Sequence, residues 1–223
     1  MTFYRDKVCI ITGGASGLGL ALGTRLAAAG ATLLLADIDE AGLAAASASM
    51  AGAVDVQRVD VTDPASVAAL VAAALARFGR IDYFFNNAGT AVIGEIRDLT
   101  LDQWRGVIET NLFGQIHAIH AVYPVMIGQG SGHIVNIASG FGMAPGPLNS
   151  PYVASKFAIF GLSHALAAEG RAFGVRVSIV CPGYLDTPMV ATSQPLNADA
   201  AALRAQLPAL VPVDKAAAIV LAG

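Results

Sequence analysis

Short apolar runs rich in β-branched residues alternate with longer stretches of helical periodicity along almost the whole chain. Parallel strands need crossover helices, and right-handed β-α-β crossovers cover a parallel sheet on both faces. The predicted strands are Val8–Thr12, Thr32–Ala36, Val54–Val59, Ile81–Asn86, His133–Ala138 and Val175–Cys181. The predicted helices are Leu18–Ala29, Glu40–Met50, Pro64–Phe78, Leu101–Met126 (one long helix or two nearly continuous ones) and Tyr152–Phe173. The pattern predicts an α/β fold, a doubly wound parallel sheet in three α/β/α layers.

The chain is predicted to form one domain. Its 223 residues suit a single domain, and residues 1–223 contain no internal repeat, linker or low-complexity segment. A further helix is predicted at Val213–Leu221 and stops at Gly223, where a doubly wound sheet of this kind normally adds another strand. We therefore expect a C-terminal strand to be missing or truncated.

Composition and charge exclude several classes of protein. Apolar residues make up 55% of the chain and charged residues 13%, which excludes a disordered protein. No apolar run reaches the roughly 18 residues that a membrane span needs, so no membrane-spanning segment is predicted. The net charge of −3 comes without any basic cluster, which argues against a nucleic-acid partner.

The cysteines and histidines favour structural roles. Cys9 and Cys181 lie in apolar strand-like runs, which is typical of small buried side chains in a reducing compartment. We therefore expect a cytoplasmic protein. His117 and His120 are three residues apart on a predicted helix and could share a metal ion, but a structural or surface role is favoured. No metal site is predicted.

A glycine-rich turn connects the first predicted strand to the first predicted helix. Its sequence, TGGASGLG, covers residues 12–19. Glycine allows a tight turn and lets the backbone approach a pyrophosphate, while the helix start supplies free N–H groups and a positive dipole end. The alternative is a tight turn without a ligand. We expect phosphate contacts from Gly13, Ser16, Gly17, Leu18 and Gly19.

An acidic residue, Asp37, ends the second predicted strand. A carboxylate at this place hydrogen-bonds the adenosine ribose hydroxyls and repels a 2′-phosphate. Residues 13–19 and 36–40 contain no Lys or Arg, so NAD is favoured over NADP. Alternatively Asp37 caps a helix or lies in a solvated turn, although Asp39 could serve as the cap instead.

A tyrosine and a lysine, Tyr152 and Lys156, are four residues apart in a predicted helix. This spacing places both side chains on one helical face, about 5–6 Å apart at Cβ. A phenol has a reference pKa of about 10, and a nearby ammonium favours the phenolate and lowers that pKa. Such a tyrosine can move protons to or from an alcohol or ketone. The pair is also common on solvated helix faces, but the glycine-rich turn and Ser139 favour the catalytic interpretation.

In the order and spacing of its motifs the chain resembles the short-chain dehydrogenase/reductase family, in its single-domain form of about 250 residues with a Rossmann-type fold. The resemblance extends from Thr12 to the helix at 213–221. The motifs that carry it are TGGASGLG at 12–19, Asp60-Val61, Asn86-Asn87-Ala88-Gly89, Asn111, Ser139, Tyr152-x-x-x-Lys156, and Pro182-Gly183 followed by Thr187. The one departure is the missing last strand, in a region that helps to form a subunit interface in this family.

The resemblance implies four catalytic residues. Tyr152 is the expected general acid/base, and Ser139 hydrogen-bonds the substrate oxygen. Lys156 binds the nicotinamide ribose and depresses the pKa of the tyrosine, and Asn111 holds a water that links Lys156 to solvent. Without the resemblance, Ser139 could be a strand-end turn residue and Asn111 a buried polar group at a helix junction.

The resemblance also implies cofactor contacts. Asp60 is expected at the adenine amino group with Val61 beside it. The residues after the fourth predicted strand are expected to line the adenosine and ribose part of the cofactor: Asn87, Ala88 and Gly89. The alternative is that they form a simple turn at the strand end. The backbone at Gly183, which follows Pro182, is expected to run beside the nicotinamide. Thr187 either reaches the carboxamide or phosphates, or caps the following helix.

Together these expectations describe an oxidoreductase that transfers a hydride between NAD(H) and an alcohol or ketone. An NADPH-dependent carbonyl reductase is the alternative, and a non-catalytic NAD-binding regulatory protein is a further one. The segments expected to border the substrate, Phe141–Asn149 and Pro188–Pro212, are mostly apolar and contain one basic residue, Arg204. We expect an apolar small-molecule substrate and a homodimer or homotetramer.

Overall fold

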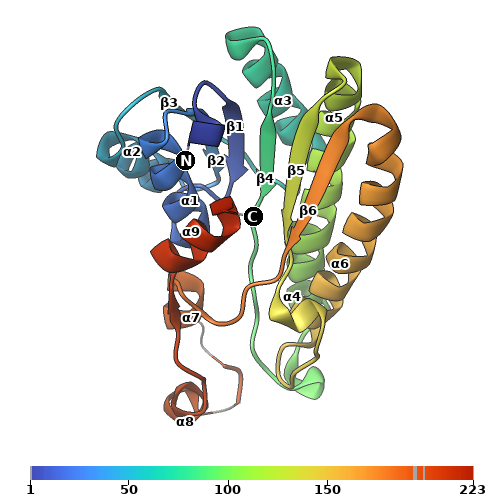
Figure 1. The fold of residues 1–223 in the computed structure, drawn as a ribbon. Coiled ribbons are helices and arrows are strands. Elements are labelled where there is room, and N and C mark those ends of the chain that lie inside the picture. Colours follow the sequence, from blue (N-terminus) through green and yellow to red (C-terminus); the bar gives the residue numbers. More distant parts are fainter. Residues whose placement is uncertain (1, 193–194, 198, 223) are drawn as a thin grey trace.

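A six-stranded parallel sheet forms the centre of the computed structural model, which describes residues 2–192, 195–197 and 199–222. The strand order is β3-β2-β1-β4-β5-β6, and all neighbouring strands pair in parallel. The strands are β1 (Val8–Thr12), β2 (Thr32–Asp37), β3 (Val54–Arg58), β4 (Tyr83–Asn86), β5 (Gly132–Ile137) and β6 (Val175–Val180). Helices cover both faces (Figure 1), which confirms the predicted doubly wound α/β fold.

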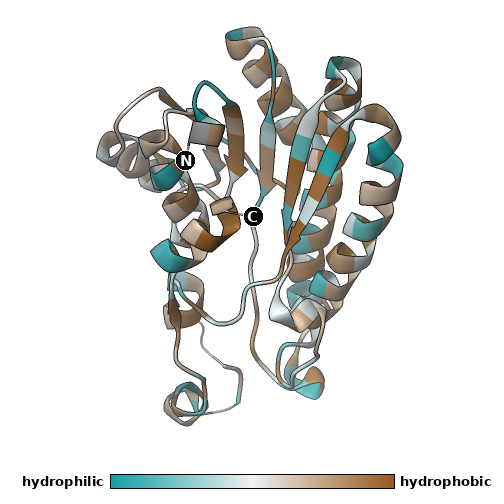
Figure 2. Ribbon diagram, in the orientation of Figure 1, coloured by the Kyte–Doolittle hydropathy of each residue, from teal (hydrophilic) through white to brown (hydrophobic). Residues whose placement is uncertain are grey.

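Strand alternation divides the core between the two faces of the sheet. Cys9 and Ile11 pack on one face, and Ile10, between them, packs on the other. All three side chains are fully buried, because a parallel sheet with helices on both faces has no solvated side. The covering helices are α1 (Gly17–Ala28), α2 (Glu40–Ser49) and α9 (Val213–Ala222) on the first face, and α3 (Pro64–Phe78), α5 (Gly114–Gln129) and α6 (Ser150–Gly170) on the second. Figure 2 shows brown, hydrophobic segments along the strands, with white and teal segments between them.

The long predicted helix at 101–126 is two helices joined through a wider turn. Helix α4 (Leu101–Ile108) begins at a capping box in which Thr100 and Gln103 bond each other's backbone. A π-helical segment, Glu109–Phe113, then leads without a break into α5. Such a segment shifts the face that each following residue presents and is frequent at functional sites.

Several short elements escaped sequence prediction. They are β7 (Leu185–Asp186), α7 (Pro188–Thr192), α8 (Ala200–Ala205) and β8 (Val211–Pro212). Strands β7 and β8 pair in parallel as a separate small sheet. Elements of two to six residues are too short to establish either hydrophobic period, so their residue pattern contains no signal for them.

Two further expectations need correction. Cys181 is only partly buried, because it lies just beyond the last residue of β6, whereas Cys9 is fully buried as expected. The strand predicted at 81–86 is shorter: β4 begins at Tyr83, and the backbone amide of Ile81 donates instead to Gln129.

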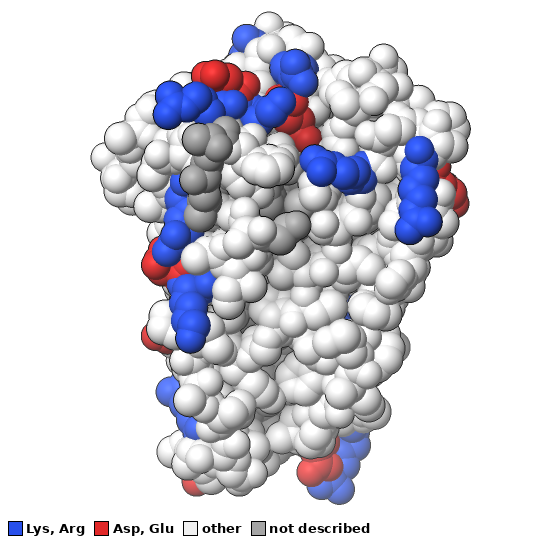
Figure 3. Space-filling view, in the orientation of Figure 1, with Lys and Arg blue, Asp and Glu red and all other residues white. Residues whose placement is uncertain are grey.

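The described residues contain no helix that is both long and apolar enough to cross a membrane. The face seen in Figure 3 carries its charged residues mainly at the upper end and along the left margin, and large areas between them are uncharged.

Phe84 tests the importance of two-sided burial. Its side chain is fully buried in β4, and replacing it with alanine should lower the free energy of unfolding by about 3–5 kcal/mol through lost burial and a residual cavity. Phe173→Ala is the matched control, because that ring is 48% exposed. Urea denaturation of both variants checks the prediction, and equal losses would contradict it.

Candidate active site

A cavity of about 1150 Å³ opens at the carboxyl ends of the strands. Strand order reverses between β1 and β4, and ligands of open α/β sheets bind in the crevice at such a point. Nearly all of the site residues expected from the sequence line this cavity: Gly13, Ser16, Gly17, Leu18, Asp37, Asp60, Val61, Asn87, Ala88, Gly89, Ser139, Tyr152, Lys156, Pro182, Gly183 and Thr187. Gly19 and Asn111 do not line it; both lie behind its wall.

The glycine-rich turn has the close packing that the sequence suggested. Gly13 has φ +67°, and a Cβ there would lie 2.9 Å from the Cα of Ala88. A Cβ at Gly19 would overlap the carbonyl oxygen of Gly13, so Gly19 lets α1 approach the turn from behind. The N-cap residue Ser16 makes no side-chain capping bond, which leaves the first N–H groups of α1 directed at the cavity. This cradle has the space and the donors that a pyrophosphate needs.

Asn87 holds the turn in place. Its side-chain amide donates to the carbonyl oxygens of Thr12 (3.0 Å) and Gly13 (3.1 Å). In return the Thr12 hydroxyl accepts from the backbone amides of Asn87 (3.1 Å) and Ala88 (3.2 Å). Asn87 is therefore both a lining residue and a strand-end structural residue. The sequence analysis did not identify Thr12 as its partner.

The carboxylate of Asp37 is positioned by the same turn. It accepts from the backbone amides of Ala15 and Asp39, each at 3.1 Å, and lies on the cavity wall. The capping role belongs to Asp39, which accepts from the Gly42 amide at the start of α2. Asp37 is thus not the helix cap, and its carboxylate faces the cavity.

A basic residue that the sequence analysis did not consider lies on the neighbouring strand. Arg58 is in register with Asp37, and its guanidinium is 3.9 Å from the carboxylate of Glu40. Arg58 is half-exposed and is not part of the cavity lining. Only the pairing of β2 with β3 brings it near Asp37, so no local motif could have signalled it.

The loop after β3 is fixed by its own hydrogen bonds. Asp60 accepts from the backbone amide and the hydroxyl of Thr62, and these bonds lower the pKa of its carboxyl group. The Val61 carbonyl accepts from Nδ1 of His117 at 2.9 Å. This contact gives His117 a structural role, and no group of three metal-ligating side chains occurs among the described residues.

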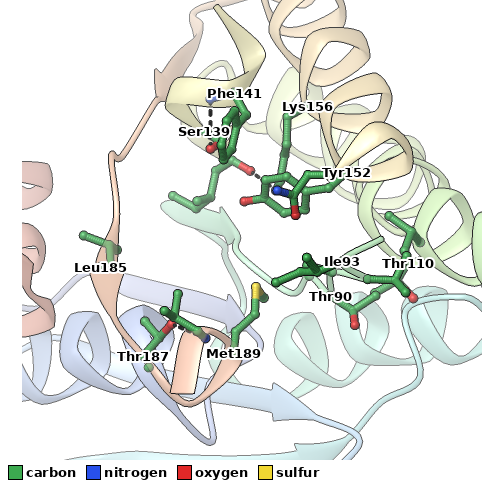
Figure 4. Close-up of a pocket in the computed structure, with 18 of the residues that line it drawn as sticks. Thr90, Ile93, Thr110, Ser139, Phe141, Tyr152, Lys156, Leu185, Thr187 and Met189 are labelled. Atoms are coloured by element: carbon green, nitrogen blue, oxygen red, sulfur yellow. Dashed lines mark hydrogen bonds between the residues drawn. The ribbon is translucent and has the colours of Figure 1, made fainter. Parts of the chain in front are cut away.

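Three candidate catalytic side chains converge at the other end of the cavity (Figure 4). Tyr152 and Lys156 come from α6, and Ser139 follows β5. The Lys156 ammonium lies 5.4 Å from the centre of the Tyr152 ring and donates to the carbonyl oxygen of Ile137 at 2.8 Å. That carbonyl, the last of β5, also accepts from the side chain of Gln115 at 3.1 Å. The Ser139 hydroxyl accepts from the backbone amide of Phe141 at 3.1 Å.

Burial has the largest effect on the pKa values of Tyr152 and Lys156. It raises the pKa of Tyr152, and a hydrogen bond from Ser139 opposes the rise. It also lowers the pKa of Lys156 to about 8, against a small opposing effect of Cys181. Burial therefore sets the direction of both pKa shifts, and the effect of Lys156 on the pKa of Tyr152 stays a prediction.

Asn111 is completely buried in the π-helical segment behind Lys156. Its side chain accepts from the Thr90 amide (2.7 Å) and donates to the Thr90 carbonyl (2.9 Å) and the Ser155 hydroxyl (3.1 Å). Ser155 in turn donates to the backbone oxygen of Tyr152. Asn111 thus ties the loop after β4 to α6, the helix that carries Tyr152 and Lys156. No sequence signal identified Thr90, Ser155 or Ile137 as parts of this group.

The loop after β6 closes the cavity opposite the glycine-rich turn. The Pro182 carbonyl accepts from the Gly140 amide at 2.7 Å, which joins this loop to the one that carries Ser139. The Thr187 hydroxyl accepts from the Val190 amide at 3.5 Å at the start of α7. A Cβ on Gly17 would lie 3.4 Å from the Thr187 methyl group. Thr187 therefore both caps α7 and faces the glycine-rich turn.

Two curated relatives illustrate what the chain is similar to. It is 38% identical over 195 residues to D-beta-hydroxybutyrate dehydrogenase of Rhizobium meliloti, an alignment that covers 82% of this chain and 73% of the relative. It is 40% identical over 198 residues to levodione reductase of Leifsonia aquatica, with 86% of this chain and 74% of the relative covered.

Solved structures and a family model agree with these relatives. A short chain dehydrogenase/reductase from Burkholderia phymatum, crystallised in complex with NAD, superimposes with a TM-score of 0.89 at 32% identity, covering 98% of this chain and 85% of the other. The family model for short chain dehydrogenase matches residues 7–197. The chain therefore belongs to the short-chain dehydrogenase/reductase family of oxidoreductases.

Proposed function

We propose that this protein transfers a hydride between NAD(H) and a secondary alcohol or ketone, with Tyr152 as the general acid/base. One observation carries the proposal: Tyr152, Ser139 and Lys156 converge at one end of the cavity whose other end holds the glycine-rich turn and Asp37. The names of the relatives, a dehydrogenase and a reductase, and the NAD-bound structure support this reading.

The residues around the cavity fit a dinucleotide. The glycine-rich turn would hold the pyrophosphate, Asp37 the adenosine ribose, and Asp60 and Val61 the adenine. Asn87, Ala88 and Gly89 would line the path to the catalytic end, where Lys156, Pro182, Gly183 and Thr187 would hold the nicotinamide half. When bound, the cofactor would supply or accept the hydride, and the protein would supply orientation and the proton.

The proton is managed by the protein's own side chains. Burial keeps Tyr152 in its neutral form, which suits donation of a proton to a carbonyl oxygen during reduction. The Ser139 oxygen accepts from the Phe141 amide, and its hydroxyl, which hydrogen-bonds Tyr152 in this structure, would donate to the substrate oxygen instead. The nearby ammonium of Lys156 would stabilise the phenolate that remains after donation. Asn111 would position the water that returns a proton to Lys156. Oxidation of an alcohol would reverse these steps.

NAD is preferred in this proposal because the Asp37 carboxylate is on the cavity wall. An NADPH-dependent carbonyl reductase is the second candidate, and Arg58 is the observation that favours it. Arg58 pairs with Asp37 in the register of β2 and β3. Its guanidinium could approach a 2′-phosphate if it left Glu40. The position of each charge supports NAD, because the carboxylate lines the cavity and the guanidinium does not.

Tyr152→Phe tests the assignment of the acid/base. The variant should keep NAD binding but lose about 10²–10⁴-fold in kcat, the contribution that is usual for general acid–base catalysis. Tyr123→Phe is the matched control: that hydroxyl is buried in α5, outside the cavity lining, and has no hydrogen-bond partner among the described residues. NADH absorbance and cofactor titration measure both effects. More than about a tenth of wild-type kcat in Tyr152→Phe would remove the assignment.

Asp37 and Arg58 test the choice of cofactor. Wild-type protein should bind NAD at least tenfold more tightly than NADP, about 1.4 kcal/mol. Asp37→Ala should weaken NAD binding and strengthen NADP binding, because a ribose hydrogen bond and a repulsion are lost together. Arg58→Ala should leave NAD binding unchanged. Fluorescence titration of both cofactors gives the answer, and tighter NADP binding by the wild type that disappears in Arg58→Ala would establish the second candidate.

Lys156 gives the protein a pH-dependent stability. Between its folded pKa of about 8 and its higher unfolded value, the unfolded chain binds more protons, so stability should rise with pH. Relative to Lys156→Met, wild-type protein should gain about 1 kcal/mol in unfolding free energy from pH 7 to pH 9. Lys215→Met, a change at an exposed lysine of α9, controls for the loss of a charge. Urea denaturation of the three proteins at both pH values, without cofactor, measures this, and a parallel response of wild type and Lys156→Met would contradict it.

A further inference from the structure

We propose that the substrate of this site is an uncharged ketone or secondary alcohol that carries an aromatic ring next to the reacting carbon, held against Phe141 and Tyr184. The inference rests on the proposed hydride transfer and adds the substrate class. It makes Phe141 a specificity-determining residue.

Phe141 forms an aromatic corner with two tyrosines beside the reacting centre. Its ring meets the ring of Tyr152 edge-on, with centres 6.3 Å apart at 89°, and the ring of Tyr184 at 5.7 Å and 83°. All three residues line the cavity. Because Phe141 lies directly against the acid/base, a group attached next to the reacting carbon would meet the aromatic corner first. Offset and edge-to-face contacts favour a flat aromatic partner in such a place.

The loop that follows is built around the Phe141 ring. A Cβ at Gly146 would overlap Cε1 of that ring, so only glycine lets the loop backbone lie against it. The Phe141 backbone amide also bonds the Ser139 hydroxyl, which fixes the start of the same loop. The position of the ring is therefore set from both ends of the segment.

Apolar side chains form much of the remaining wall at this end, beside polar ones such as Thr90 and Thr110. In Figure 4, Ile93, Leu185 and Met189 lie across the cavity from Tyr152. A flexible thioether such as that of Met189 adapts to irregular ligands and makes favourable contacts with aromatic rings. A ring between the aromatic corner and these side chains would exchange water for apolar surface on both of its faces.

The charges of the cavity disfavour an anionic substrate. Among the described lining residues only Lys156 and Arg204 are cationic. The ammonium of Lys156 is 3% exposed and bonded to the Ile137 carbonyl. The guanidinium of Arg204 donates to the Ala191 carbonyl. The two lining carboxylates, Asp37 and Asp60, are at the adenosine end. A substrate carboxylate would lose its hydration with only the buried Lys156 ammonium and the exposed, carbonyl-bonded Arg204 guanidinium to offset that loss.

Four ketones test the proposal in an NADH oxidation assay: acetophenone, 2-butanone, 4-methyl-2-pentanone and acetoacetate. Acetophenone should exceed 2-butanone at least tenfold in kcat/KM. The neutral 4-methyl-2-pentanone should exceed acetoacetate, which has a similar shape but a carboxylate, at least tenfold. The inference is overturned if acetophenone is not reduced, if 2-butanone equals it, or if acetoacetate is the better of its pair.

Two variants test the role of Phe141. In Phe141→Ala the ratio of kcat/KM for acetophenone over 2-butanone should fall at least tenfold, mainly through KM for acetophenone. Phe141→Leu keeps the apolar volume and guards against misfolding, and it should lower the same ratio at least threefold. Phe173→Ala, at an exposed ring outside the cavity lining, should keep the wild-type ratio. An unchanged ratio in both Phe141 variants overturns the inference. The proposed function stands separately as long as any ketone is reduced in a Tyr152-dependent way.

Discussion

Parallel strand pairing is the constraint on which the rest of this molecule depends. Strands that all run the same way have their carboxyl ends at the same edge of the sheet, and each crossover begins there before it returns over one face. The loops after all six strands therefore meet in one place. Residues as distant in sequence as Gly13 and Gly183 line one cavity for this reason. The reversal of strand order between β1 and β4 keeps two of those crossovers apart and leaves the space between them open.

The end of the cavity that holds Tyr152 and Lys156 combines two groups whose pKa values burial shifts in opposite directions. A buried phenol resists losing its proton, and a buried ammonium resists keeping its own. Both shifts oppose the charged form, yet with a pKa of about 8 the Lys156 amine is still mostly an ammonium at pH 7, whereas the phenol of Tyr152 stays neutral. In the proposed reaction the phenolate charge would then be created beside a cation already present, in a buried site where their attraction is strong. Buried polar bonds from Asn111 and Ser155 hold the backbone around this pair.

The sequence predicted the parts of the structure whose signals are local or periodic. The six strands follow from β-branched apolar runs, and the turn between β1 and α1 lies where the glycine-rich motif at 12–19 predicted it. Features that depend on tertiary contacts were not predictable. Arg58 comes near Asp37 only through strand register. The raised pKa of Tyr152 follows from its burial in the folded protein. The four-residue spacing from Lys156 contains no information about that burial.

The bond from Lys156 to the last carbonyl of β5 has a consequence for how this protein can change. Its acceptor is a main-chain atom, so no substitution at Ile137 can delete it. The Lys156 ammonium is thus attached to the main chain of the sheet, the part of the fold that side-chain substitution alters least. The surrounding loops, such as the one that carries Phe141, can vary in length and side chains without releasing the ammonium. Under the proposed function, such a chain could acquire new substrates by loop replacement, while Lys156 would keep its place and its role in proton transfer because its acceptor belongs to the sheet.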